Sequence, residues 1–261
     1  MRIATWNING VKARIDNLLH WLSEAAPDVV CLQEIKSVDE SFPSDVLGDA
    51  GYNCAVLGQK GFNGVALLSK HPIEDVTRGL PDGDDDGQAR FIVGLVAPKG
   101  GTPVRVASAY MPNGNPIDSE KFAYKLAWLK RLEGWARAAL ADEELLVIGG
   151  DYNIIPEPID AKNPEVWTGD ALFQPESRAA YRRLKALGLT DAVRAVDDRG
   201  GVYTFWDYQA GAWQKNNGIR IDHLLLSPEA ADRLAEAGID RHVRAWEKPS
   251  DHVPVWIALR E

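Results

Sequence analysis

The stretch 145–153 constrains the fold more than any other part of the chain. Four apolar residues, Leu145 to Ile148, are followed by two glycines and then by Asp151, Tyr152 and Asn153. A continuous apolar run of this length predicts a strand that is buried on both faces. Because residues i and i+2 of a strand point the same way, Asp151 and Asn153 are expected to project together from its end. An isolated Asp-x-Asn is more often an Asx cap at a surface turn, so the rest of the chain has to decide between the two.

Strand candidates outnumber helix candidates along the remaining sequence. Several of them are continuous apolar runs, which favours two sheets packed face to face with helices outside over a single doubly wound sheet. No low-complexity tract, linker or short repeat divides the chain, so we expect one domain over residues 1–261. Helices are expected at 15–22, 116–140, 181–187 and 228–238, and strands at 29–32, 65–68, 90–96, 104–110, 145–148, 202–206, 219–226 and 253–259, after a first strand that ends at residue 7.

Two segments carry more specific expectations. The connection 156–175 is polar and too long for a simple turn, so we expect it to form a functional loop. In the helix expected at 116–140, Lys121, Lys125 and Lys130 lie largely off the apolar stripe and are expected to form a solvated face.

The composition is that of a soluble globular protein. Hydrophobic residues make up 45% of the chain and charged residues 26%, and no apolar run is long enough to span a bilayer. The first residues enter a strand pattern at once, without a signal segment, and the two cysteines, Cys31 and Cys54, agree with a reducing compartment. We therefore expect a cytoplasmic protein with no membrane partner.

The net charge of −9 argues weakly against a nucleic-acid partner, because counterion release requires Lys and Arg on the contact face. Part of the excess lies in one loop, Asp82-Gly83-Asp84-Asp85-Asp86. This loop could hold a cation, but a solvated turn that repels DNA is the commoner outcome. Carboxylates gathered around a divalent metal would also add to the negative sum, so the local distribution of charge has to decide.

Polar side chains recur where the predicted strands end. Any one of them is more often a cap or a surface charge than a catalyst, but six such strand ends are hard to explain as capping. If these ends meet at one rim, the side chains form a single site. They are Asn7, Glu34, Tyr110, Asp151 with Asn153, Asp222, and Asp251 with His252.

This set of donors favours metal-assisted attack of water on a phosphodiester. Oxygen ligands from Glu, Asp and Asn suit Mg²⁺ or Mn²⁺, and a single His among carboxylates argues against a structural zinc site. A divalent metal would polarise a phosphoryl oxygen and stabilise the leaving oxygen. A His with a carboxylate partner, together with amide and phenol donors, would stabilise charge in the transition state.

Six motifs occur in order along the chain, at 5–10 (Thr-Trp-Asn-Ile-Asn-Gly), 33–36 (Gln-Glu-x-Lys), 110–114 (Tyr-x-Pro-Asn-Gly), 150–153 (Gly-Asp-x-Asn), 220–222 (Arg-Ile-Asp) and 250–255 (Ser-Asp-His-x-Pro-Val). Together they resemble the exonuclease III family of abasic-site endonucleases, within the wider endonuclease/exonuclease/phosphatase superfamily. Gly-Asp-x-Asn and Ser-Asp-His are shared across the superfamily, whereas Gln-Glu-x-Lys and Tyr-x-Pro-Asn are typical of the DNA-repair branch. The resemblance implies an α/β (α+β) fold, a four-layer αββα sandwich of two packed mixed β-sheets flanked by helices.

The resemblance also implies a metal site. Glu34 is expected to be the principal ligand, with Asn7 and Asp251 in or beside the coordination sphere, and Mg²⁺ is the expected ion, for which Mn²⁺ would substitute. One metal and two metals are both open at this point. The candidate ligands are Asn7, Glu34, Asp151, Asn153, Asp251 and His252.

The same resemblance implies catalytic roles for Tyr110, Asp151, Asn153, Asp222 and His252. Asp151 is expected to position or deprotonate the attacking water, and Asn153 to hold it. His252, oriented by Asp222, is expected at the scissile phosphate, and Tyr110 there or at the leaving group. The base is either Asp151 or the Asp222–His252 pair.

Contacts with DNA are expected from two groups of residues. Lys36, Asn113, Arg90 and Asn9 are expected near phosphates. Phe205, Trp206, Ile219 and Ile221 resemble an apolar pocket for a flipped-out, baseless sugar, whose selectivity would come from its small size. The alternative is that these four are strand core residues, since alternate positions of a strand face opposite ways.

The resemblance implies a Mg²⁺-dependent DNA repair nuclease that cuts 5′ to abasic sites in base excision repair, with 3′–5′ exonuclease and 3′-phosphodiesterase or 3′-phosphatase activity. Its partner would be double-stranded DNA with abasic sites or 3′ ends, and a monomer is expected. The alternative is a phosphoesterase of the same superfamily that acts on small-molecule or lipid headgroup phosphates. The Tyr110–Asn113 motif counts against that alternative, and the ratio of the two nuclease activities is left open.

Overall fold

The chain forms two six-stranded sheets in a computed structural model that describes residues 1–81, 83 and 86–260. In the first sheet, β1 and β2 run parallel and the other neighbours are antiparallel. The expected mixed sheet is therefore present. Its strands, in spatial order, are β11 (Leu234–Ile239), β12 (Val255–Leu259), β1 (Arg2–Asn7), β2 (Val29–Gln33), β4 (Val65–Ser69) and β3 (Asn53–Leu57).

The second sheet is also mixed. Its only parallel pair among the described strands is β7 with β8, so the carboxyl ends of these two strands meet at the same edge. The strands, in spatial order, are β5 (Ile73–Arg78), β6 (Phe91–Val96), β7 (Val104–Tyr110), β8 (Leu146–Asp151), β10 (Asp222–Leu226) and β9 (Thr190–Asp191).

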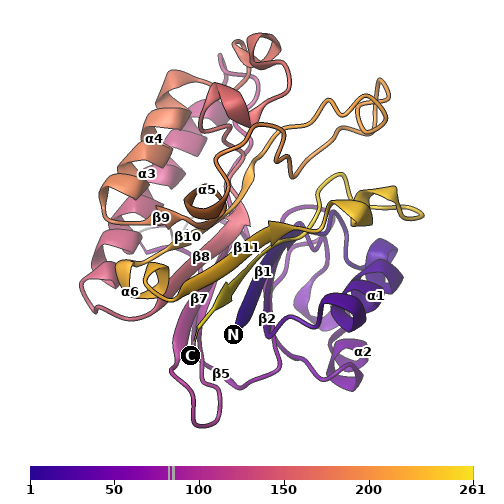
Figure 1. Cartoon of the computed structure of the whole chain (residues 1–261), viewed down its shortest axis with the longest axis vertical. Coiled ribbons are helices and arrows are strands. Elements are labelled where there is room, and N and C mark those ends of the chain that lie inside the picture. Colours follow the sequence, from indigo (N-terminus) through magenta and orange to yellow (C-terminus); the bar gives the residue numbers. More distant parts are fainter. Residues whose placement is uncertain (82, 84–85, 261) are drawn as a thin grey trace.

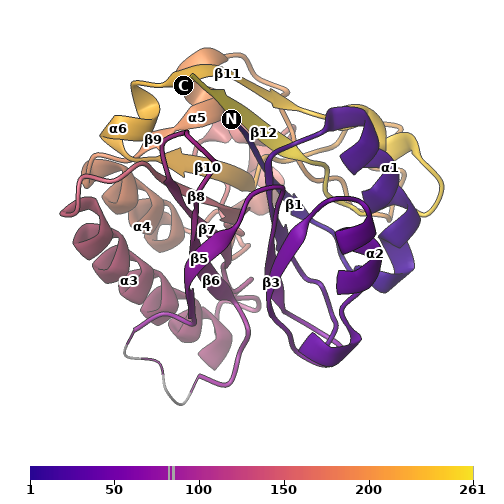
Figure 2. The same cartoon turned by 90° about the horizontal axis from the view of Figure 1, so that it is seen from below.

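The two sheets pack face to face, with helices on both outer faces (Figures 1 and 2). The central core joins Ile3 and Val29 of the first sheet to Val106, Val147 and Leu224 of the second. Because every strand near the middle is covered on both sides, β2, β4, β8 and β10 are buried along their whole length. The predicted four-layer sandwich is confirmed.

The helices cover the sheets with apolar stripes. Trp21 of α1 packs edge-on against Trp6 of β1, and Trp128 of α3 and Tyr181 of α4 share a cluster with Ile148 of β8. None of the helices that the structure describes combines the length and the apolar character needed to cross a membrane. The helices are α1 (Ile15–Ala25) and α2 (Ser44–Asp49) on the first sheet, α3 (Glu120–Leu140) and α4 (Pro175–Ala186) on the second, and the short α5 (Ala192–Val196) and α6 (Pro228–Ala231).

The connection 156–175 contains two 3₁₀ turns before α4 begins at Pro175. Asp160 at the end of the first turn is buried, so this connection packs onto the protein as an ordered segment. The 3₁₀ segments among the described residues are η1 (Lys12–Arg14), η2 (Asp39–Ser41), η3 (Pro158–Asp160), η4 (Pro164–Trp167) and η5 (Arg241–Ala245).

Several predicted elements differ from those in the structure. The helix expected from residue 116 begins at Glu120, because Ser119 is its N-cap and accepts a hydrogen bond from the Lys121 N–H. The expected strand 202–206 is absent, and only Phe205 forms isolated bridges, to Ile219 and His252. The following strand correspondingly starts at residue 222 rather than 219.

The helix expected to end at Gly238 stops at Ala231, and residues 234–239 form the edge strand β11 instead. Ser227 is the predicted N-cap and accepts a hydrogen bond from the Ala230 N–H. A side chain at Gly238 would lie 2.5 Å from the Trp256 ring of the neighbouring strand. The glycine therefore allows close strand packing, and does not mark a helix end as we predicted.

Candidate active site

Five strand ends meet at one rim of the sandwich. The end of β1 lies beside the end of β2, and the end of β7 lies beside the end of β8, because both pairs are parallel. The antiparallel β10 begins where β8 ends, so Asp222 is paired with Asp151. Face-to-face packing then brings Asn7 of the first sheet to Asp151 of the second, with 3.0 Å between the Asn7 Nδ2 and Asp151 Oδ2 atoms.

Two carboxylates share the amide of Asn7. Its Nδ2 donates to Glu34 Oε1 at 2.9 Å as well as to Asp151. The Tyr110 hydroxyl donates to the same Glu34 oxygen at 2.8 Å. Glu34 itself sits in the left-handed region with φ of 48°, so the chain turns sharply at the end of β2 and directs this carboxylate toward the second sheet. The arrangement brings together the carboxylates of Glu34 and Asp151, which are 117 positions apart in the sequence.

Asn153 is hydrogen-bonded to Asp151 at the end of β8, where the sequence places the two residues on the same side of the strand. The Asn153 N–H donates to Asp151 Oδ1 at 2.9 Å, and the Asn153 side-chain amide donates to Met111 O at 2.9 Å and to Asp151 Oδ2 at 3.4 Å. Both residues are buried. The Asp151 carboxylate is therefore held by donors on both oxygens and has little freedom to rotate.

His252 is oriented by Asp222. Its Nδ1 lies 2.8 Å from Asp222 Oδ2, and that oxygen also accepts from the Thr204 hydroxyl at 2.6 Å. The Nε2 of His252 is left facing Asp151, 3.8 Å from Asp151 Oδ2. Thr204 was missed from the sequence, because a threonine in an irregular segment carries no signal of its partner.

Burial sets the protonation behaviour of the site, and neighbouring charges oppose or reinforce it. Burial raises the pKa of Asp151, against the His252 charge and with the Asp222 charge. Burial also opposes the charged form of Glu34, but hydrogen bonds from Asn7 and Tyr110 and the charge of Lys36 bring its pKa below the usual range. Burial lowers the pKa of His252, but the charges of Asp222 and Asp151 outweigh it and raise the pKa to about 10.

The donors at the rim fit a divalent cation. The Glu34 and Asp151 carboxylates converge on the side-chain nitrogen of Asn7, and carboxylate oxygens are ligands that hard cations prefer. The Lys36 ammonium lies 3.0 Å from Glu34 Oε2, so the site already attracts one positive charge. Single oxygen and nitrogen atoms of Asp151, Asp222 and His252 also lie within 4.8 Å of one another. Since the Asp222 carboxylate already contacts His252 Nδ1, its oxygens are less available to a cation than those of Glu34 and Asp151.

Comparison with known proteins agrees with this arrangement. Residues 4–252 match the model of the Endonuclease/Exonuclease/phosphatase family. Exodeoxyribonuclease III of Haemophilus influenzae is 36% identical to this chain, over 100% of both proteins. The chain belongs to the endonuclease/exonuclease/phosphatase family.

Within this family the chain is a nuclease of the exodeoxyribonuclease III type. A 3′ phosphatase from Neisseria, solved with a product DNA hairpin, is 38% identical and superimposes with a TM-score of 0.96 over 100% of both chains. An AP endonuclease from Archaeoglobus fulgidus is 36% identical, with a TM-score of 0.93 over 100% of both chains. The predicted membership and fold are confirmed.

Asp251 and Asn9 occupy the outer side of the nuclease site. Asn9 Nδ2 donates to Asp251 Oδ1 at 3.0 Å, and Lys36 Nζ donates to Asn9 Oδ1 at 2.5 Å. Lys36 thus bridges Asn9 and Glu34. The sequence did not single out Tyr208, whose half-exposed hydroxyl accepts from Asn9 and Arg14 and donates to Pro249 O at 2.8 Å.

Arg90 lies between two cavities beside the site. Its guanidinium packs over the Tyr110 ring, 4.7 Å from the ring centroid. A cavity of about 310 Å³ is lined by Arg90, Asn113, Lys121 and Tyr124 and opens next to Tyr110. Asn113 is exposed, and its amide reaches Asn153 Oδ1 at 3.3 Å. Among the predicted phosphate-binding residues, Arg90 and Asn113 therefore share one surface.

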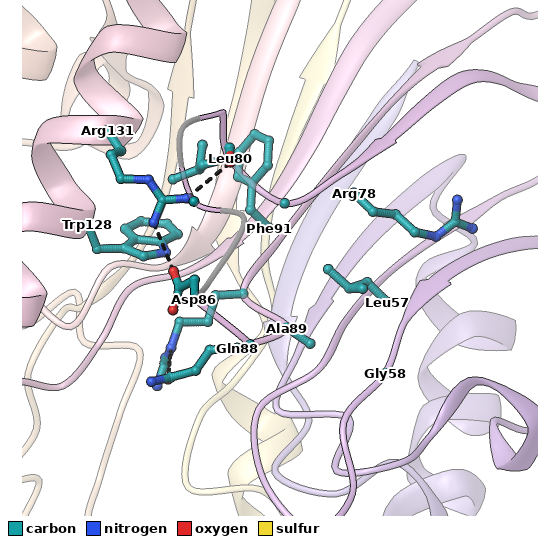
Figure 3. A pocket seen from close by; sticks show the side chains of 14 residues that line it. Leu57, Gly58, Arg78, Leu80, Asp86, Gln88, Ala89, Phe91, Trp128 and Arg131 are labelled. Carbon is teal, nitrogen blue, oxygen red and sulfur yellow. Dashed lines mark hydrogen bonds and ion pairs between the residues drawn. The ribbon is translucent and has the colours of Figure 1, made fainter.

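The second cavity, of about 410 Å³, lies between α3 and the edge of the second sheet (Figure 3). Figure 3 shows the Arg131 guanidinium directed at Asp86 and at the backbone of Leu80, with an Arg131–Asp86 separation of 2.9 Å. Asp86 also accepts from the Tyr124 hydroxyl at 2.5 Å, so it fastens its end of the aspartate loop to α3. The expected cation site or solvated turn at 82–86 lies largely outside the described residues.

The four residues expected to line an apolar pocket differ in their exposure. Trp206 is fully buried in a cluster with Tyr203 and Val253, and Ile219 and Ile221 are almost fully buried as well. These three are core residues, and the expectation that they touch a ligand directly is corrected by their burial. Phe205 remains partly exposed, and its ring packs edge-on against His252 with 4.9 Å between centroids.

Two buried charged groups behind the site were also missed. Lys125, expected on a solvated face, is completely buried, whereas Lys121 and Lys130 are exposed as predicted. Burial lowers the pKa of Lys125 to about 7, against the charges of Asp151 and Asp170. Arg220 is buried with two aspartates and a histidine just before Asp222.

Proposed function

We propose that this nuclease hydrolyses the phosphodiester on the 5′ side of abasic sites in double-stranded DNA. The same site would act on 3′ ends as a 3′–5′ exonuclease and 3′-phosphatase, in base excision repair. The observation that carries the proposal is the position of Asp151, whose carboxylate lies between the Asn7–Glu34 set and the His252–Asp222 pair. A phosphate placed beside Asp151 would face the carboxylates proposed to hold a cation on one side and the His252 imidazole on the other.

Mg²⁺ is the proposed cofactor, with Mn²⁺ as a substitute. Glu34, Asn7 and Asp151 would hold the ion, and Asn153 and Asp251 stand next to them. When bound, the ion supplies charge neutralisation at a phosphoryl oxygen and at the leaving oxygen. Lys36 would then move from Glu34 toward a DNA phosphate, since a divalent cation competes for the same carboxylate.

Asp151 is proposed to take the proton of the attacking water. Both of its oxygens are fixed by the backbone and side chain of Asn153 and by Asn7, which leaves the carboxylate oriented for one water. His252 has its Nδ1 occupied by Asp222, so its Nε2 is the atom available to a phosphoryl oxygen. A cationic His252 would stabilise the charge that develops in the transition state, which favours Asp151 over His252 as the base.

Tyr110 would act as a donor throughout the reaction. Burial and the charges of Glu34 and Asp151 raise the pKa of Tyr110 well above its usual value, so the phenol keeps its proton at neutral pH. Its hydroxyl, now on Glu34, would be available at the leaving oxygen or at the phosphate.

DNA is the proposed partner, bound by a single copy of the chain. Arg90, Lys121 and Asn113 line the cavity beside Tyr110 and would follow the phosphate backbone. Phe205 would border a small space next to His252 for a sugar without a base. The relatives include an exodeoxyribonuclease III, a 3′ phosphatase and an AP endonuclease, which supports one site that serves several DNA ends and lesions.

One duplex tests the proposal directly. It carries an internal abasic site in one strand and a recessed 3′ end in the other, with a different label on each strand. With Mg²⁺ we expect incision 5′ to the abasic site and stepwise shortening of the recessed end, and EDTA should stop both. Shortening without incision would remove the endonuclease activity from the proposal. Hydrolysis of inositol phosphates without cleavage of this duplex would instead favour a small-molecule phosphoesterase.

A further inference from the structure

Lys125 is a buried amine directly behind the site. It lies on α3 and has no solvent exposure, although its helical neighbours Lys121 and Lys130 are exposed. Its Nζ donates to two backbone carbonyls, that of Asn113 at 3.0 Å and that of Asn153 at 2.5 Å. These two carbonyls belong to the loops that follow β7 and β8, so one side chain fastens both loops to α3.

Burial of this ammonium is costly. In the part of the chain that the structure describes, Lys125 forms no ion pair with a carboxylate, so two carbonyls are its recorded partners. An ammonium removed from water without a paired charge is strongly destabilising, and a leucine or methionine would fill the same helical position at lower cost. The cost suggests that the contacts of Nζ serve the site rather than the fold.

Gly114, the last residue of the Tyr-x-Pro-Asn-Gly motif, leaves room for the aliphatic part of the Lys125 side chain. Gly114 has φ of +90°, and a side chain there would lie 2.7 Å from the Lys125 Cδ atom. The glycine of Tyr-x-Pro-Asn-Gly therefore allows both a left-handed turn and the passage of the lysine to Asn113 and Asn153.

The carbonyl contacts determine where the Asn153 side chain points. Asn153 adopts φ of 47°, an uncommon conformation for a residue with a side chain, and its amide reaches Asp151 Oδ2 and Met111 O. Asn113 Nδ2 in turn reaches Asn153 Oδ1 at 3.3 Å. Without a donor on the Asn153 carbonyl, the peptide that follows Asn153 would be free to rotate, and both amides would lose their alignment.

We propose that Lys125 is a positioning residue for catalysis, which acts through the Asn153 carbonyl to hold Asn153 against Asp151 and through the Asn113 carbonyl to keep the neighbouring loop in register. This inference depends on the proposed DNA cleavage, because its readout is turnover on DNA. It adds a component that lies outside the set of residues expected to touch the metal, the water or the phosphate.

The first test compares Lys125→Met with Lys130→Met. Methionine fills nearly the same volume without a donor, and Lys130 is an exposed lysine on the same helix. With rates normalised to the folded fraction, we expect kcat to fall about tenfold or more in Lys125→Met, since small displacements of catalytic groups have effects of this size. We expect KM for DNA to change less than about threefold, and Lys130→Met to behave as the wild type.

The second test is a double-mutant cycle with Asn153→Ala. If Lys125 acts through Asn153, Lys125→Met should reduce kcat by less than about threefold in the Asn153→Ala background, because the group it positions is already absent. Equal fold-losses in both backgrounds would contradict the proposal, since a general loss of packing would be additive with the loss of Asn153.

Two outcomes of the first test would also overturn the inference: a wild-type kcat in Lys125→Met, or a rise in KM at unchanged kcat. If Lys125→Met does not fold, Lys125→Gln is used in its place and is judged by the same two criteria, because a glutamine is too short to reach both carbonyls. A wild-type enzyme that leaves DNA uncut would refute the proposed function itself, which separates the two failures.

Discussion

At the scale of single residues, the Asp151 carboxylate meets neighbours of three kinds. Asn7 and Asn153 donate hydrogen bonds to it, and His252 Nε2 faces it at 3.8 Å. A carboxylate that only capped a turn would need the contact with the Asn153 N–H alone. The further contacts, from two other parts of the chain, support the proposed role at the reacting phosphate.

Replacement of this carboxylate should separate binding from turnover. In Asp151→Asn the amide keeps the shape but cannot accept a proton, so we expect kcat to fall by roughly a thousandfold or more. DNA affinity, measured by fluorescence anisotropy, should stay within about threefold, because removal of one negative charge does not weaken phosphate binding. The control is Asp118→Asn, at an exposed position in the loop that follows β7. It should leave both kcat and DNA affinity unchanged. Turnover close to that of the wild type in Asp151→Asn would exclude Asp151 as the base.

The residues of the site were predictable to different extents. Glu34, Asp151, Asp222 and His252 lie at or close to strand ends and in distinctive motifs, so the sequence predicted that they would meet. Lys125 could not be found in this way, because a lysine beside an apolar stripe is normally solvated and only Gly114 hints at its path. The sequence could not place Trp206, Ile219 and Ile221, because an apolar residue in a motif is compatible with both a pocket wall and a core.

At the scale of elements, Arg220 connects three segments just before the site. Its guanidinium lies 2.7 Å from Asp160 in the 156–175 connection and 2.9 Å from Asp191 of β9. It also lies 2.9 Å from Nδ1 of His223 on β10. The predicted functional loop 156–175 is thus anchored to the strand that presents Asp222.

Removal of this anchor should be strongly destabilising. In Arg220→Met the buried carboxylates of Asp160 and Asp191 both lose the Arg220 guanidinium, although Asp160 keeps its ion pair with Arg194. We expect the free energy of unfolding to fall by about 3 to 5 kcal/mol. Urea denaturation measures this loss. Arg199→Met breaks an exposed pair with Asp197 and should leave the free energy of unfolding close to that of the wild type. A difference of less than about 1 kcal/mol between the two variants would show that the buried cluster does not hold the segments together.

Prediction of elements was good in the centre of the sheets and poor at their edges. Strands buried on both faces, such as β2, β4 and β8, read as apolar runs and were found. The edge strands β3, β5 and β11 mix polar and apolar residues because they are partly exposed, and the edge strand β9 has only two residues. Strands β3, β5 and β9 were missed from the sequence, and β11 was predicted as part of a helix. Their pairing is imposed by the neighbouring strand rather than by their own pattern.

At the scale of the whole molecule, global stability depends on titratable groups buried far from solvent. His223 is completely buried between the rings of Tyr152 and Tyr181 and beside Arg220. Burial and the Arg220 charge lower the pKa of His223 to about 4, from the ordinary value of 6.5. Burial opposes the charged form of Asp191, but the Arg220 and His223 charges lower its pKa to about 2.

The pH dependence of the free energy of unfolding should reflect the titration of His223. Its folded pKa lies below its unfolded pKa, so between pH 6.5 and pH 4 the unfolded chain binds a proton that the folded chain does not. The free energy of unfolding must therefore decrease as the pH is lowered through that window, by about 3 kcal/mol at most. In His223→Gln this part is absent, and the stability difference from the wild type should shrink as the pH falls. A difference that is constant from pH 7 to pH 4 would contradict the depressed pKa. His20→Gln, at an exposed position, is the control.

The pairing of β1 with β12 has a consequence for synthesis on the ribosome. Met1 N lies 2.8 Å from Leu259 O, and Asp251 and His252 lie shortly before β12, the strand that pairs with β1. A nascent chain therefore carries Glu34 and Asp151 long before it carries the histidine that would face the phosphate. We therefore expect translation products that end before His252 to lack DNA-cleaving activity, because the imidazole proposed to face the phosphate is absent from them.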